Sequence, residues 1–145
     1  MNGIILARSG QPFTPVTNLD IANVGALTAN SRVRPDLIGN PHLDNPAPAR
    51  WFNTNAFRAP AQYTFGSAGR NVLRSDSFQD FALSLFREDR LTERIRLQFR
   101  AESFNLINHP SFGVPQTTIT SSLFAAVGGT ASNARQIQLG LKLLF

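Results

Sequence analysis

The chain has 145 residues, enough for one domain with a hydrophobic core, and only 16% of them are charged. It carries 14 basic and 9 acidic residues, and all but one of the basic residues are arginine. The resulting net charge of +5 permits an anionic partner without indicating one. The absence of cysteine excludes disulfides and thiolate metal sites. The absence of any run of ~18 apolar residues excludes a transmembrane helix.

The first predicted strand covers about residues 3–8, and a long irregular connection follows over about residues 9–76. Seven prolines interrupt this connection, and each of them removes a backbone hydrogen-bond donor. Its segments 50–57 and 63–70 are rich in aromatic residues. We expect Trp51 and Tyr63 in these segments to pack locally rather than to serve in surface recognition. The glycines of this connection lack the strand–loop–helix context of a phosphate site and predict turns.

Two further strands are predicted over about residues 77–87 and 92–106, joined by a short charged turn. Apolar and polar residues alternate in both with a period of two, whereas a helix would scatter the same apolar residues around its circumference. Opposite charges predict a register in which Asp80 pairs with Arg100, because a shift by two residues would oppose Asp80 and Glu102. A change of phase near Phe104 predicts a bulge or the exit of the strand from the membrane.

A second long connection, over about residues 107–134, leads to the terminal strand, about residues 135–145. Its alternation is broken only by Leu144. A transmembrane β-strand needs ~9–11 residues that alternate between lipid and lumen. Long connections on one side and a short turn on the other are typical of bacterial outer-membrane barrels. The sequence therefore predicts an all-β fold, an antiparallel meander of about four long strands that forms part of an outer-membrane β-barrel with long irregular loops.

The alternation assigns the strand residues to two faces. The polar face is predicted to line the barrel lumen and comprises Asp80, Arg94, Arg96, Gln98, Arg100, Glu102, Gln136, Gln138 and Lys142. The apolar face is predicted to contact lipid and comprises Phe81, Leu83, Leu85, Ile95, Leu97, Phe99, Ile137, Leu139, Leu141 and Leu143. The terminal Phe145 resembles the signal by which the barrel-assembly machinery recognises the last strand of a barrel.

Short motifs along the whole chain resemble one family of transporters. These motifs are Ser9–Thr14, Arg32–Leu37, Arg50–Thr54, Phe65–Asn71, Leu91–Arg94, Phe99–Glu102, Phe104–Asn105, Asn108–Pro110 and Phe112–Gly113. The chain resembles the C-terminal end of Oar-like TonB-dependent receptors, large outer-membrane transporters common in acidobacteria. The resemblance implies a barrel of about twenty-two strands with an N-terminal plug and a segment that engages TonB. It places those N-terminal parts outside these residues.

We therefore expect residues 1–145 to be the C-terminal segment of a receptor barrel in the outer membrane of a Gram-negative bacterium. The apolar run within Met1–Arg8 is too short for a signal peptide, so we expect a longer chain to carry the export signal. The expected function is a structural wall and outer-loop segment in energy-coupled uptake or export of a large solute. The expected partners are membrane lipid, the rest of the parent barrel, the assembly machinery, and TonB only through the N-terminal parts.

The sequence gives less support to other classes of function. His42 and His109 are the only histidines, and neither lies near a pair of carboxylates, so we expect no enzyme activity, metal or cofactor. A basic nucleic-acid binder would need arginines and aromatic residues on one face, whereas the alternation places them on opposite faces. A soluble secreted or surface β-rich binding module stays an alternative, and it predicts a monomer that needs no detergent.

Overall fold

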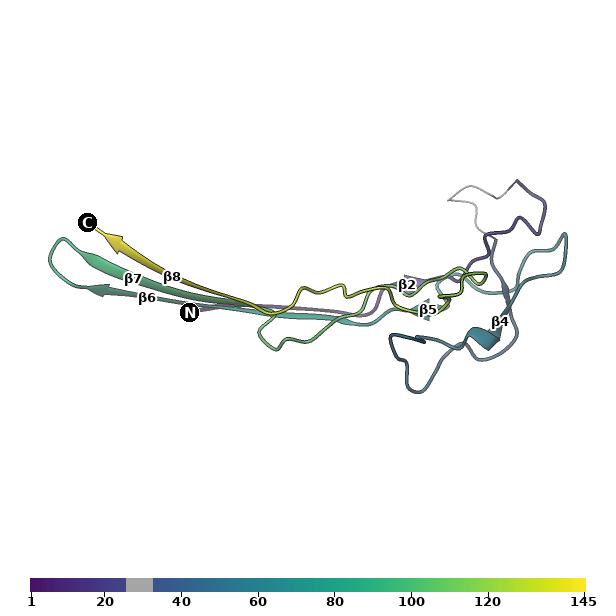
Figure 1. Ribbon diagram of the computed structural model, residues 1–145, viewed down its shortest axis with the longest axis horizontal. Coiled ribbons are helices and arrows are strands. Elements are labelled where there is room, and N and C mark those ends of the chain that lie inside the picture. The colour runs from purple at the N-terminus through teal and green to yellow at the C-terminus, as the bar shows by residue number, and fades with distance from the viewer. Residues whose placement is uncertain (26–32) are drawn as a thin grey trace. The chain divides into compact units, whose positions relative to one another are not determined.

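The computed structural model describes residues 1–25 and 33–145, and these divide into two compact units (Figure 1). The first unit, called the sheet unit, comprises Met1–Ser9, Ser77–Ser111 and Ala131–Phe145. The second, called the loop unit, comprises Gly10–Asp76 and Phe112–Thr130. Within these described ranges no α-helix is present, and no helical segment is long and apolar enough to cross a membrane.

The sheet unit contains four antiparallel strands in the order β1-β6-β7-β8. Their bounds are β1 Asn2–Arg8, β6 Phe78–Arg90, β7 Arg96–Phe104 and β8 Gln136–Leu144. Each long strand neighbours the next one along the chain, and the sheet does not close on itself. The predicted all-β fold with an antiparallel meander is therefore confirmed. Figure 1 shows the C-terminus at the same end of the sheet as the turn between β6 and β7.

The turn between β6 and β7 differs from the predicted one, because residues 87–90 belong to β6 and residues 91–95 form the turn. The backbone amides of Leu91 and Thr92 donate to the Ile95 carbonyl at 2.9 and 3.1 Å. The Thr92 hydroxyl accepts from the Ile95 amide at 3.0 Å. Because a hairpin's turn fixes its register, this turn shifts the pairing from the predicted one. The predicted Asp80–Arg100 pair is wrong: Arg100 lies opposite Phe86 and Asp80 lies opposite Leu6 of β1.

The observed register gives two carboxylates of the hairpin, those of Glu88 and Glu102, suitable partners. Glu102 lies opposite Ser84, whose hydroxyl donates to the Glu102 carboxylate at 3.3 Å. Arg96 lies opposite Arg90, an unfavourable pairing of like charges. Its guanidinium instead donates to the Glu88 carboxylate at 3.0 Å, which offsets that repulsion. Charge pairing therefore contributes to this register, but through residues that the sequence analysis did not pair.

Strand β7 ends where the sequence predicts a break. Asn105 follows it with a φ of 48°, a left-handed conformation that asparagine tolerates better than most residues. Its side-chain amide donates to the Asn133 carbonyl at 2.8 Å, and its side-chain oxygen accepts from the His109 amide at 3.1 Å. Strand β7 thus ends at Phe104, two residues earlier than predicted, and a buried asparagine holds this end. Whether the strand leaves the membrane here stays a prediction.

In its described residues, the loop unit contains only short regular elements. Strand β2 (Pro12–Phe13) pairs with β5 (Leu73–Arg74), and β3 (Asp36–Leu37) pairs with β4 (Phe57–Arg58), which the 3-10 helix η1 (Thr54–Ala56) precedes. The prolines account for this shortness, because each removes a donor that a longer ladder would need.

Both long connections contribute to one hydrophobic core in the loop unit. The buried residues of this core are Phe13, Phe52, Ala56, Phe57, Ala68, Leu73 and Ala125. The Phe52 ring lies 5.0 Å, centroid to centroid, from that of Phe124, which comes from the second connection. The Trp51 amide donates to the Ala125 carbonyl at 2.9 Å, which also joins the two connections. Segments that the sequence suggests are separate loops thus form a single packed unit.

The two aromatic residues expected to pack in the loop unit behave differently. The Trp51 indole donates to the Arg74 carbonyl at 3.0 Å and lies edge-on to Phe112, with ring centroids 6.0 Å apart, so its predicted packing role is confirmed. Tyr63 has a left-handed φ of 62° and is 70% exposed, so its predicted packing role is wrong. A tyrosine needs a pocket as well as aromatic neighbours in sequence, and residues 1–25 and 33–145 provide none at this position.

Candidate functional site

The pairings in the sheet keep even-numbered residues opposite even-numbered ones and odd opposite odd. The predicted lumen residues within the strands therefore share one face, called the polar face, and the predicted lipid residues share the other, called the apolar face. Two assignments to these strands are wrong, because Arg94 and Ile95 lie in the turn. The observed register between β6 and β7 differs from the predicted one by six residues. This difference leaves both faces unchanged, because only a shift by an odd number of residues exchanges them. Whether these faces contact lumen and lipid stays a prediction.

The apolar face is widely exposed on the sheet itself. Ile137, Leu139 and Leu141 of β8 are 64%, 72% and 70% exposed. At the end near the short turn this face also carries Arg87 and Asp89, whose side chains form an ion pair at 2.8 Å. This pair was not predicted, because the strand was expected to end at about residue 87, whereas β6 continues to Arg90. The apolar band on β6 therefore stops at Leu85, and a charged pair follows it.

Three phenylalanines of the sheet, Phe78, Phe86 and Phe104, lie on the polar face and were also missed. The guanidinium of Arg8 lies 4.5 Å from the Phe78 ring centroid, and that of Arg100 lies 5.9 Å from the Phe86 ring centroid. The expected separation of arginines from aromatic residues is thus wrong at these positions. Phe104 is the third of these rings. Among the described residues no guanidinium lies over it, and it is 43% exposed.

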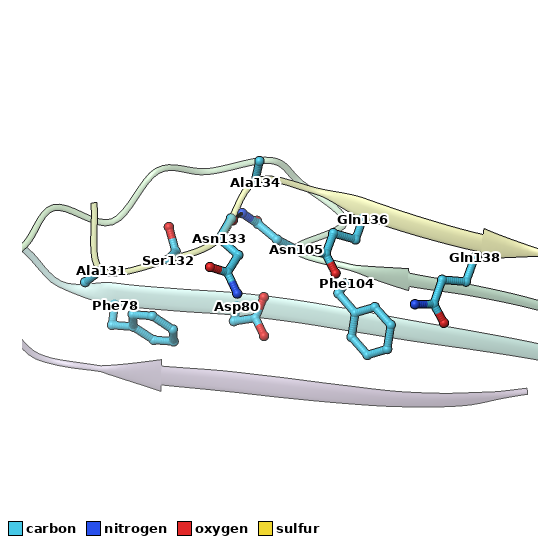
Figure 2. A pocket seen from close by; sticks show the side chains of 10 residues that line it. All are labelled: Phe78, Asp80, Phe104, Asn105, Ala131, Ser132, Asn133, Ala134, Gln136 and Gln138. Atoms are coloured by element: carbon cyan, nitrogen blue, oxygen red, sulfur yellow. Dashed lines mark hydrogen bonds between the residues drawn. The ribbon is translucent and has the colours of Figure 1, made fainter. Parts of the chain in front are cut away.

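The polar face has a hollow beside Phe104 with a volume of about 420 Å³ (Figure 2). Strands β6, β7 and β8 and the segment before β8 line it through Phe78, Asp80, Phe104, Asn105, Ala131, Ser132, Asn133, Ala134, Gln136 and Gln138. The structure therefore brings together three predicted lumen residues, Asp80, Gln136 and Gln138. The predicted partner of Asp80, Arg100, is not among them.

The hollow is lined by both polar and aromatic side chains. In the described part of the chain, no hydrogen bond or ion pair is formed by the side chains of Asp80, Gln136 and Gln138. Asn105 differs, because its amide is used in holding the end of β7. The hollow thus contains one carboxylate, the neutral amides of Gln136 and Gln138, and the partly exposed phenyl ring of Phe104.

Within residues 1–25 and 33–145, no group of three histidine, aspartate or glutamate residues lies close enough together to hold a metal ion. His42 and His109 are both exposed in irregular segments. A metal usually needs three or four protein ligands in one place.

The model of one protein family, the outer membrane beta barrel domain, matches residues 1–138. The chain belongs to this family. Its long alternating strands and its short turn opposite two long connections agree with that membership. The barrel protein is accordingly an outer-membrane protein. No curated protein and no solved structure matches the chain.

Proposed function

We propose that this barrel protein forms wall and outer-loop structure of an Oar-like TonB-dependent receptor, which moves a large solute across the outer membrane by energy-coupled uptake or export. In this proposal the apolar face contacts membrane lipid and the polar face lines the lumen. TonB acts through N-terminal parts outside these residues, and the chain has no catalytic role of its own.

The observation that carries the proposal is the loop unit. Its core is built from both long connections, which leave the sheet at the same end, next to the paired residues Arg8 and Phe78 and next to Phe104 and Gln136. Connections of this length are usual on the outer side of outer-membrane barrels, whose turns on the other side are short. The resemblance of the loop motifs to Oar-like receptors supports the same class of transporter.

The open edges of the sheet also support a larger assembly. Strands β1 and β8 each have a neighbour on one side only, and backbone groups that face hydrocarbon must be paired. Further strands of one barrel supply these partners in the proposed receptor. A soluble binding module would instead have to cover the exposed leucines and isoleucines of β8 with a second sheet, and no strand among residues 1–25 and 33–145 does so.

The proposal is tested by comparing solutes that cells deplete from, or release into, the medium. Three strains of the source bacterium are compared: the wild type, one lacking the gene for this protein, and one depleted of TonB. We expect one large solute whose depletion or release is lost in both altered strains, because transport needs both the barrel and its energy source. Equal solute profiles in all three strains would reject the proposal. A loss that depends on the gene but not on TonB would indicate a passive channel.

A further inference from the structure

We propose that the hollow beside Phe104 is a binding subsite for a neutral, hydroxyl-rich solute such as a sugar ring. The inference deepens the proposed function, and rests on it only for the statement that the ligand is transported. The binding itself follows from the side chains that line the hollow.

The size and composition of the hollow suit a small ligand. Its volume of about 420 Å³ falls within the range of ~300–1,000 Å³ that is usual for small-molecule sites. Figure 2 shows Phe104 between Asp80 and Gln138, with all three side chains on the same side of the sheet. A flat apolar surface beside several hydrogen-bonding groups matches a sugar ring, which has C–H groups on its faces and hydroxyl groups at its rim.

The hydrogen-bonding groups favour hydroxyls. The Asp80 carboxylate only accepts, so it takes the protons of hydroxyl donors. The side-chain amides of Gln136 and Gln138 both donate and accept, as hydroxyl groups also do. Asp80 lies on β6 and the two glutamines lie on β8, with β7 between these strands. Residues 136 and 138 alternate to the same face of β8. A ligand with several adjacent hydroxyls satisfies them together.

The charges around the hollow argue against an ionic ligand. Its only charged lining residue is Asp80, which repels an anion. A cation would be drawn to that carboxylate and to the aromatic rings. However, the guanidinium of Arg8 already lies over the Phe78 ring, on the same face of the sheet. The positive charge of Arg8 repels a second cation, and the Phe78 ring is already in contact with the Arg8 guanidinium. A neutral ligand is therefore favoured over both an anion and a cation.

The test measures binding to the full-length protein purified in detergent, by calorimetric titration. The probes are methyl α-glucoside, methyl β-galactoside and maltotriose as sugars, choline as a cation and citrate as an anion. We expect at least one sugar to bind more tightly than choline and citrate. Asp80→Asn is expected to weaken that binding about tenfold or more, because a charge-assisted hydrogen bond is lost. Phe104→Leu is expected to weaken it several-fold through loss of the flat ring.

Asp44→Asn is the matched control, since it removes the same charge from an exposed position in the loop unit and should leave the dissociation constant unchanged. No binding of any of the three sugars, or equal binding by wild type and Asp80→Asn, would overturn the inference. Tighter binding of choline than of the sugars would assign the hollow to cations and would also overturn it. Because the titration needs no TonB, sugar binding in a protein that fails the transport test would reject the receptor and leave the subsite standing.

Discussion

The loop unit should unfold as a structure with its own core, and Phe52→Ala is the change that tests this. Phe52 is 1% exposed, and its ring lies 5.8, 5.8 and 5.0 Å, centroid to centroid, from the rings of Phe13, Phe57 and Phe124. Truncating a buried phenylalanine costs ~3–5 kcal/mol, as lost burial and as a cavity. The three aromatic neighbours place this site toward the upper end of that range.

The assay uses Trp51, the only tryptophan of the chain, whose indole is bonded within the loop unit. Its fluorescence is followed in urea with the protein in detergent micelles. With a slope of ~1–3 kcal/mol per molar urea, we expect the midpoint to fall by about 2 M. The control Phe65→Ala, at a position 71% exposed, should change the free energy of unfolding by less than ~0.5 kcal/mol. Equal midpoints for the two variants would refute the assignment of Phe52 to a packed core.

Three further changes test other parts of the structure. Leu139→Arg, on the apolar face, should lower the barrel's free energy of unfolding in lipid vesicles by ~2–4 kcal/mol. The control Gln138→Arg, on the polar face, should lower it far less. Equal losses in the two variants would contradict the predicted faces. Gly66→Ala should make the loop unit sensitive to trypsin, because the added Cβ would meet the backbone of residues 34 and 35, whereas Gly69→Ala meets no neighbour and should behave as wild type. Arg96→Met removes an exposed ion pair at the short-turn end, so urea unfolding should show a loss of only ~0.2–1 kcal/mol; a loss of several kcal/mol would mean that this pair holds the register.

The glycine prediction has a direct structural reason. A Cβ on Gly66 would overlap the backbone of Arg34 and Pro35, and one on Gly10 would overlap the backbone of Ser75. In both places two segments of the loop unit approach each other too closely for any side chain. The sequence identified these glycines as turn residues, whereas the structure shows that close packing of the backbone requires them.

The face of each strand residue followed from the sequence, because alternation with a period of two is a property of each strand alone. Gln138 and Leu139 could be assigned to opposite faces without knowledge of any neighbour. The change of phase near Phe104, where β7 ends, was visible in the sequence for the same local reason. The family resemblance and the matching family model both rest on the sequence as well, and they agree on an outer-membrane barrel.

The pairing between strands was decided by the tertiary structure, because register depends on the turn and on contacts between distant residues. A turn closed by Thr92 and Ile95 extended β6 to Arg90 and separated Asp80 from Arg100. That same extension placed a charged pair on the apolar face and a phenylalanine beside Arg100.

The sequence by itself determined the type of structure, the two faces of its strands and the family to which it belongs. Only the tertiary structure decided that two loops far apart in the chain share the core around Phe52, and that Asp80, Phe104 and Gln138 line one hollow. The physical reason is that alternation and proline content act within a few residues. A shared core or a binding hollow, by contrast, depends on side chains that only folding brings together.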